Sequence, residues 1–232
     1  MKLISTGIPG LDEMLGGGIP KGHITVIIGP PGTGKSTLAL QFIHTGLKKN
    51  ENCTYLSLEE DEEDLIRTAA SFQWNLKPYT ENGKLALTRF SAHNIKATID
   101  RVENDLQKIL ETFKPERFAM DPITLYEMIH DTDQERRTCL FHFTQMIKNI
   151  KTTAILTSEI NPRNPNYSRY GLLEYVADGV ILLKYIRPEN SKTTVTAIEI
   201  LKMRRISHSK ETRPYTITQN GINVHSESEV FV

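Results

Sequence analysis

The chain has 232 residues, enough for one α/β domain with a complete hydrophobic core. Lys and Arg together number 28, as do Asp and Glu, so the net charge is zero and lacks the basic excess typical of obligate nucleic-acid binders. No apolar run approaches the ~20 residues of a membrane-spanning helix, and Cys53 and Cys139 are isolated, without metal-ligand spacing. We therefore expect a cytoplasmic protein that has no membrane or nucleic-acid partner.

The first 22 residues precede the first predicted core strand. Ile8, Leu11 and Leu15 recur at helical spacing, and three glycines at 16–18 stop this short helix. We expect the segment 1–22 to pack its apolar side on the core, so that residues 1–232 form a single domain.

A phosphate-binding motif follows the first core strand. Residues 29–37 fit G-x-x-x-x-G-K-[ST], between a β-branched run at 24–28 and apolar residues that recur at helical spacing after residue 37. The glycines let successive amide groups point at one anion, and the new helix adds its positive end. Lys35 should reach the β- and γ-phosphates and take part in catalysis, and the Ser36 hydroxyl should hold Mg²⁺. The residues expected to bind nucleotide are Gly29, Pro30, Pro31, Gly32, Thr33, Gly34, Lys35, Ser36 and Thr37.

Two glutamates stand at the end of the second predicted strand, residues 54–58. Ligands of open α/β sheets bind outside the carboxyl ends of the strands, so Glu59 or Glu60 could orient or deprotonate an attacking water. The alternative is that acidic residues here favour the start of the next helix. We assign that second role to residues 61–64.

A third predicted strand at 84–90 and an amphipathic helix at 95–113 lead to a strand at 117–121 that ends in an acid. Asp121 matches the second element of a nucleotide site, where a carboxylate helps to hold Mg²⁺. A turn cap before Pro122 is the alternative. A helix at 133–149, a strand at 152–157 and a loop at 161–169 follow.

Strands alone are predicted after the last helix, at 179–185, 193–204, 214–218 and 222–224, with Asn220-Gly221 as a hairpin signal. This order predicts an α/β fold, a mainly parallel sheet flanked by helices and extended by antiparallel strands. The strand at 193–204 leads into a basic stretch that contains Lys202, Arg204 and His208. Such residues could supply the arginine finger that a nucleotide site needs, or form a solvated edge strand, and spacing alone does not decide.

Several motifs together resemble the KaiC branch of the RecA superfamily of P-loop NTPases, and above all its single-domain archaeal members. The segments that carry the resemblance run almost end to end: Ser5–Asp12, Gly16–Gly22, the loop at 29–37, Leu58–Glu60, Arg169–Gly171, Asp178–Val180, Ile200–Arg204, Pro214–Thr218 and Asn220–Ile222.

The resemblance implies a RecA-like core and a homo-oligomeric ring, most often a hexamer, with ATP at each subunit junction. It implies that Glu59 and Glu60 are the catalytic pair. It also implies that Lys202, Arg204 and His208 reach the ATP of the adjacent subunit, and that residues 157–159 occupy the strand end where the family senses nucleotide state.

Three departures from the family pattern matter. The clock protein of the family carries two such domains in tandem, whereas this chain carries one. The autophosphorylating domain has adjacent Ser and Thr where this chain has Glu174 and Tyr175, so we expect no Ser/Thr autokinase activity there. Arg205 replaces the usual Gly and Pro122 the usual Ser.

The sequence therefore predicts Mg²⁺-dependent binding and slow hydrolysis of ATP by an oligomer that acts as a nucleotide-driven switch on an unidentified regulatory protein. One alternative is a regulatory module of the archaellum-motor type that binds ATP with little turnover. Another is a RecA/RadA-like accessory protein of DNA recombination, against which the zero net charge and the absence of zinc-ligand cysteines argue.

Overall fold

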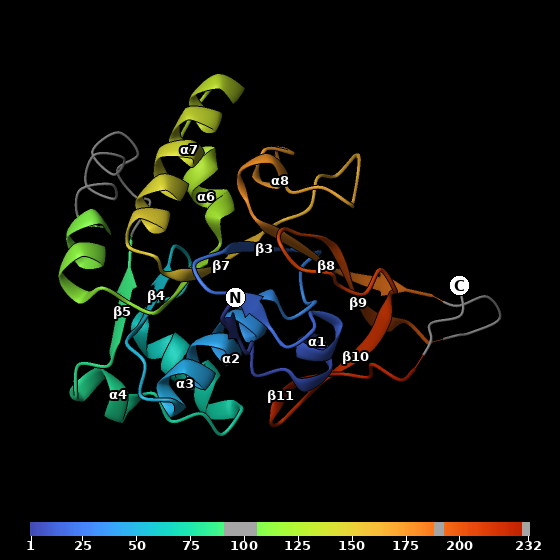
Figure 1. Cartoon of the computed structure of the whole chain (residues 1–232), viewed down its shortest axis with the longest axis horizontal. Helices are drawn as coiled ribbons and strands as arrows, with labels where there is room; N and C mark the ends of the chain where they lie inside the picture. The colour runs from blue at the N-terminus through green and yellow to red at the C-terminus, as the bar shows by residue number, and fades with distance from the viewer. Residues whose placement is uncertain (91–105, 188–192, 229–232) are drawn as a thin grey trace.

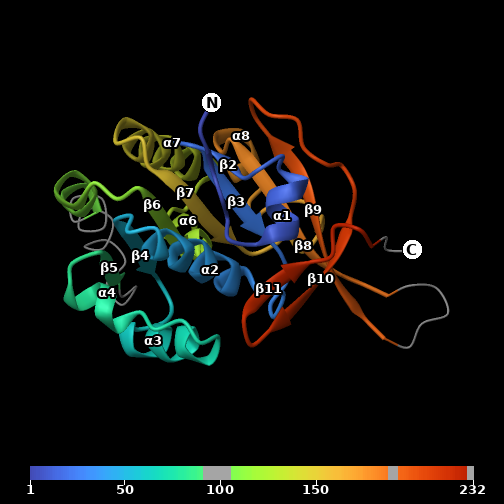
Figure 2. The same cartoon turned by 60° about the horizontal axis from the view of Figure 1, so that its bottom comes forward.

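The computed structural model describes residues 1–90, 106–187 and 193–228, in which nine strands form one sheet with helices on both faces (Figures 1 and 2). The strand order is β11-β10-β9-β8-β3-β7-β6-β4-β5. The parallel part of the sheet comprises β3 (Ile24–Ile28), β4 (Cys53–Ser57), β5 (Leu85–Arg89), β6 (Arg117–Asp121), β7 (Thr153–Ser158) and β8 (Gly179–Ile186). The antiparallel extension comprises β9 (Val195–Met203), β10 (Arg213–Thr218) and β11 (Gly221–Val224). The predicted fold class is confirmed.

Side-chain alternation along the buried strands builds two cores, one on each face of the sheet. Ile27 of β3 belongs to one core, whereas its neighbours Val26 and Ile28 belong to the other. Because β3 is buried on both faces, its sequence is continuously apolar or β-branched, as parallel central strands require.

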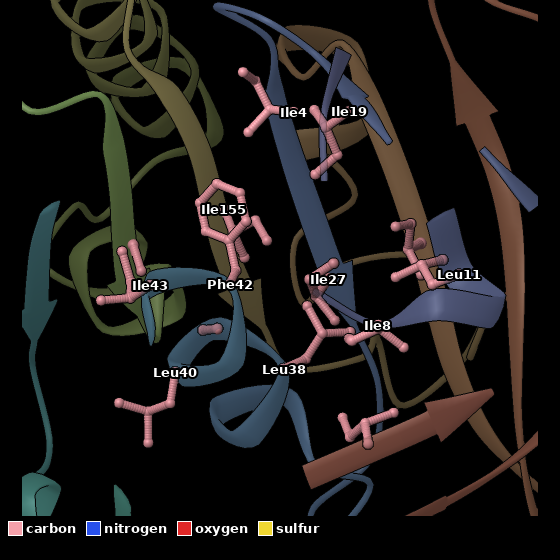
Figure 3. Packing of buried hydrophobic residues seen from close by; sticks show 14 of the residues in the cluster. Ile4, Ile8, Leu11, Ile19, Ile27, Leu38, Leu40, Phe42, Ile43 and Ile155 are labelled. Carbon is pink, nitrogen blue, oxygen red and sulfur yellow. The ribbon is translucent and has the colours of Figure 1, made fainter. Parts of the chain in front are cut away.

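The first core lies under α1 (Pro9–Met14), α2 (Lys35–Lys48), α3 (Glu62–Ser71) and α4 (Lys77–Glu81). Figure 3 shows Leu38 and Phe42 of α2 pointing toward Ile27 and Ile155 of the sheet. Full burial of each such side chain is worth about 1.5–3 kcal/mol. Packing on the sheet therefore fixes the direction of α2, which starts directly after the phosphate-binding loop.

The second core lies under the helical residues 106–113 together with α6 (Ile123–Met128), α7 (Asp133–Asn149) and α8 (Leu173–Val176). The predicted helix at 95–113 lies partly outside the described residues, and 106–113 is helical as predicted. In the part of the chain that the structure describes, no helix is both long and apolar enough to cross a bilayer.

The N-terminal segment forms a two-stranded sheet of β1 (Leu3–Ile4) and β2 (Ile19–Pro20), with α1 between them. Ile4, Ile8 and Leu11 lie in the same core as α2 (Figure 3). The Asp12 carboxylate accepts hydrogen bonds from the backbone and hydroxyl of Thr6, both at 2.7 Å. These bonds fix the turn before α1, while the apolar residues pack the segment on the core.

The sequence patterns do not predict five short elements of the structure, namely β1, β2, α4, α6 and α8. Each has six residues or fewer, too short for an apolar period to show. The predicted C-terminal hairpin is present, but its turn falls at residues 219–220, and Gly221 already pairs with Thr218. Gly221 is required because its φ is +101° and a Cβ would lie 2.5 Å from both Gln41 and Trp74.

The turn after β9 places Arg205 in the left-handed region, with φ of +68°. Its side chain is exposed, so side-chain packing contributes little stability to offset the strain of this backbone conformation. Glycine adopts this conformation without strain, although it loses more backbone entropy on folding. We predict that Arg205→Gly raises the free energy of unfolding by about 0.5–1 kcal/mol, measured by urea denaturation.

The matched control is Arg137→Gly at an exposed position inside α7. There glycine should lower the free energy of unfolding by about 1 kcal/mol. Loss of stability in both variants would show that the turn imposes no strain on Arg205.

Candidate functional site

Parallel register brings the functional strand ends to one edge of the sheet. Ile28 pairs with Ser158, and Ser57 pairs with Asp121. Residues that follow β3, β4, β6 and β7 therefore emerge side by side, at the carboxyl ends where open α/β sheets bind ligands. The phosphate-binding loop, Glu59 and Glu60, Asp121 and residues 157–159 all lie at this edge.

The loop at 29–34 turns tightly into α2. Gly32 and Gly34 have φ of +79° and +85°, and a Cβ on Gly34 would come within 2.6 Å of Ile217. Gly34 is the N-cap of α2, so Lys35, Ser36 and the following residue form the first helical turn. The amides and positive end of this turn suit a bound anion.

Hydrogen bonds from the loop itself and from the C-terminal strands hold it in place. The Thr33 hydroxyl donates to the Pro30 carbonyl at 2.8 Å, and the buried Tyr215 hydroxyl donates to the Thr33 carbonyl. Tyr185 donates to the Pro31 carbonyl at 3.3 Å. These contacts fix the conformation of the loop.

Lys35 lies between the loop and the acidic strand ends. Its ammonium group donates to the carbonyls of Gly29 and Pro30 at 2.8 and 3.0 Å. Burial lowers the pKa of Lys35, and the charges of Asp121 and other carboxylates at this edge oppose that change. The lysine is thus held against the loop, within the influence of the acidic charges at the strand ends.

Two hydroxyl groups hold Asp121. The Tyr55 hydroxyl donates to Oδ2 at 2.6 Å, and the Thr157 hydroxyl donates to Oδ1. Burial, and next the charge of Asp121, raise the pKa of Tyr55 well above its ordinary value, so the phenol remains a donor. Sequence reasoning missed Tyr55, because an aromatic residue inside a buried strand is an ordinary core residue.

Glu59 and Glu60 follow β4 in a turn fixed by Ser57. The Ser57 hydroxyl accepts from the amides of Glu59 and Glu60 at 3.3 and 2.9 Å. Desolvation and, second, the charge of Asp121 raise the pKa of both glutamates. Oε2 of Glu60 is buried and has no hydrogen-bond partner among the described residues. Both carboxylates thus lie within the influence of the Asp121 charge, and one oxygen of Glu60 is buried without a partner among the described residues.

These residues fit a magnesium–nucleotide complex. Mg²⁺ in nucleotide sites takes one or two carboxylates together with phosphate oxygens and water. Asp121 supplies a carboxylate at the strand end, and Ser36 supplies a hydroxyl in the first turn of α2. The unpartnered oxygen of Glu60 agrees with an additional polar ligand at this edge.

Residues 157–159 connect the site to α6. Thr157 donates to Asp121, as described, and the Ser158 hydroxyl lies 3.1 Å from that of Thr124. The same Thr124 hydroxyl accepts from the Glu159 amide at 3.0 Å. Thr124 was also missed by sequence reasoning, because it lies in a helix too short to be recognised.

The basic residues of β9 lie elsewhere. Gly179 pairs with both Thr25 and Met203, which puts the end of β9 at the amino ends of the parallel strands. Lys202 donates to the carbonyls of Glu174 and Ala177, both at 2.8 Å. The structure therefore does not bring Lys202 to the loop of its own chain.

Of the other two predicted residues of this group, Arg204 lies in the turn after β9 and His208 in the irregular segment that follows it. Arg204 contacts the Asp178 carboxylate at 3.3 Å and is about half exposed. His208 Nδ1 lies 2.9 Å from the Ser209 carbonyl oxygen. The sheet separates both from the phosphate-binding loop of this chain.

A mainly parallel sheet with antiparallel C-terminal strands, and this loop between β3 and α2, define the class of RecA-like P-loop ATPases. A family model described as KaiC, an ATPase, matches residues 4–229. The chain therefore belongs to the KaiC ATPase family.

Individual relatives support the same family assignment. The circadian clock oscillator protein KaiC of Parathermosynechococcus lividus is 34% identical over 230 residues, covering 94% of this chain and 41% of that protein. The protein of the same name from Synechococcus elongatus is 32% identical, covering 94% and 43%. The chain thus spans less than half the length of these curated relatives. A crystal structure of a KaiC-like protein from the hyperthermophilic archaeon Pyrococcus horikoshii OT3 matches with a TM-score of 0.83 and 32% identity, covering 97% of this chain and 99% of that one.

The Tyr55–Asp121 hydrogen bond offers a direct test of how the site is held. Tyr55→Phe removes a donor from a carboxylate that lies beside other acidic groups. We predict a loss of about 1.5–3 kcal/mol in the free energy of unfolding, the range for hydrogen bonds to charged groups. Urea denaturation without nucleotide measures it.

Tyr185→Phe is the matched control, because the Tyr185 hydroxyl is exposed and bonds a neutral carbonyl. Its effect should stay within about 0.5 kcal/mol. Equal effects of the two substitutions would show that Asp121 does not need the phenol.

Proposed function

We propose that this protein binds Mg²⁺-ATP and hydrolyses it slowly, in an oligomer whose assembly follows the nucleotide state. The observation that carries the proposal is the meeting of Lys35, Asp121 and the Glu59–Glu60 pair around one phosphate-binding loop. Each residue type at this edge has a role that phosphoryl transfer to water requires.

The roles follow from position and charge. Lys35 would move from the loop carbonyls to the β- and γ-phosphates, and Ser36 and Asp121 would hold Mg²⁺, which neutralises charge on the phosphates. Glu59 or Glu60 would orient and deprotonate the attacking water. Their raised pKa supports this role, because a carboxylate of higher pKa accepts a proton more readily.

The trans site completes the proposal. Lys202, Arg204 and His208 lie at the opposite edge of the sheet from the loop, so a head-to-tail neighbour is the site that they can serve. Lys202 would exchange the carbonyls of α8 for phosphate oxygens. Burial lowers the pKa of Lys202, with the charge of Arg204 as the next cause, so the ammonium group gains from an anion at the junction. A hexamer is the ring that the family resemblance favours.

Hydrolysis would remove the contacts that the γ-phosphate makes across the junction, which turns nucleotide state into assembly state. Such a switch would act on a regulatory protein partner. We propose no Ser/Thr autokinase function for Glu174 and Tyr175, because neither residue is a Ser or Thr acceptor.

The glutamate pair supplies the first test. We predict that the double variant Glu59→Gln, Glu60→Gln loses more than about 100-fold in phosphate release, because an amide cannot act as the base. It should keep its affinity for Mg²⁺-ATP, since the loop and Asp121 are unchanged. Phosphate release and binding of a fluorescent ATP analogue are measured on the same samples, and turnover that survives would remove the pair from the mechanism.

The oligomer supplies the second test. We predict that light scattering gives a larger mass with Mg²⁺-ATP than without it, and that phosphate is released slowly from the assembled form. A monomer that still hydrolyses ATP would exclude the trans residues from catalysis. An assembled form with no phosphate release would instead favour the module with little turnover.

Mixing two inactive variants isolates the trans contact. Lys35→Ala has a damaged loop but intact basic residues, whereas Arg204→Ala has the reverse. In a mixed ring about one quarter of the junctions would join an intact loop to an intact arginine. Recovery of activity on mixing supports the trans site, and its absence from rings shown to be mixed would contradict it.

A further inference from the structure

Glu127 is a fully buried acidic residue outside the nucleotide site. It lies in α6, is 0% exposed, and neither of its carboxyl oxygens has a hydrogen-bond partner among the described residues. A buried charge without a partner costs several kcal/mol, so such a group stays neutral where it can. A protonated carboxyl group removes the charge and keeps the side chain in place.

Two charged groups from other helices act on Glu127. Glu174 lies on α8, and Arg136 on α7 donates to the backbone carbonyl of Glu127 at 3.2 Å. The guanidinium group of Arg136 lies over the Tyr170 ring, 4.1 Å from its centre, and donates to the His130 carbonyl. Arg136 thus holds the backbone at the end of α6, while no bond from it to the Glu127 carboxyl group is present.

The two glutamates have opposite surroundings. The carboxylate of Glu174 accepts hydrogen bonds from the Ser168 amide and, at 2.9 Å, from the Ser168 hydroxyl. Glu127 has no such donors and lies within the field of the Glu174 charge. Burial, and next the charge of Glu174, raise the pKa of Glu127 to about 8, against a smaller opposing effect of Arg136. The proton therefore belongs to Glu127.

We propose that Glu127 is a proton-controlled latch: α6, α7 and α8 pack as observed only while its carboxyl group is protonated, and deprotonation loosens α8 from α6. The latch is a property of the fold and does not require nucleotide. Repulsion between two carboxylates would act directly on α8, because Glu174 belongs to that helix.

A second consequence rests on the proposed function. The carbonyls of Glu174 and Ala177 hold Lys202, and the next carboxylate along the chain, Asp178, contacts Arg204. Loosening α8 would alter how these cations are held for the neighbouring subunit. Alkaline pH should therefore change assembly at a fixed concentration of Mg²⁺-ATP.

Linkage gives the sign and size of the effect. Between the ordinary value of 4.5 and about 8, the folded chain holds a proton that the unfolded chain has lost. As the pH rises through this window, Glu127 alone weakens the folding equilibrium about ten-fold per pH unit, and the effect levels off above the folded pKa.

The test compares urea denaturation of the wild type and Glu127→Gln across this pH range, without nucleotide. Glutamine imitates the neutral acid and cannot lose the proton. The ratio of the two folding equilibria should shift in favour of the variant by about ten-fold per pH unit. Glu63→Gln, at an exposed position, is the control, and its stability should depend on pH in the same way as that of the wild type. If the stability of Glu127→Gln also has the pH dependence of the wild type, the latch is wrong.

Infrared spectra of the wild type and of Glu174→Gln provide a second test if Glu127→Gln does not fold. Infrared spectra of the wild type should show a protonated carboxyl band at neutral pH that disappears as the pH rises through about 8. Absence of the band would refute the proposal. In Glu174→Gln the band should disappear at lower pH, because the neighbouring charge is gone.

Hydrogen exchange separates the latch from the trans site. Amides of residues 168–178 should exchange faster as Glu127 deprotonates, and should lose this pH dependence in Glu127→Gln, beyond the intrinsic effect of pH. If hydrogen exchange changes with pH as predicted and assembly does not, the latch stands and the trans role of Lys202 and Arg204 fails. If neither exchange nor assembly changes with pH, the latch itself is wrong.

Discussion

The parallel register of β3, β4, β6 and β7 is the constraint on which the candidate site depends. Because paired strands start and end together, the loop after Ile28, the turn after Ser57 and the carboxylate of Asp121 are delivered to one edge. Tyr55 and Thr157 then convert this proximity into fixed geometry, since each donates to one oxygen of Asp121. The acidic edge exists because hydroxyl groups inside the core hold it.

The antiparallel extension places the basic residues and supports the phosphate-binding loop. Reversal of direction between β8 and β9 carries the basic residues to the amino edge, while β10 returns to support the phosphate-binding loop through Tyr215 and Ile217. One strand system thus serves both edges of the sheet. The proposed head-to-tail oligomer uses this arrangement, because each copy presents a loop at one edge and cations at the other.

Patterns longer than a few residues made most of the fold predictable. The run at 24–28, the loop motif and the strand-only C-terminal part were enough for the sheet and its class. The contacts of α6 were not predictable, because Thr124 and Glu127 lie in a six-residue helix after Pro122, where no apolar period can be counted. Likewise Arg205 was noticed as a departure from the family pattern, but only the backbone shows that this turn needs a positive φ.

Helix α6 has only six residues, but it interacts with the nucleotide-site edge of the sheet at its start and with α8 near its end. At its start Thr124 bonds to Ser158 and to the Glu159 amide, beside the nucleotide site. Near its end the buried Glu127 lies in the field of Glu174, on the helix whose carbonyls hold Lys202. In the proposed oligomer, α6 would link a subunit's own nucleotide to the cations that it offers to its neighbour, through the bonds of Thr124 and the interaction between Glu127 and Glu174.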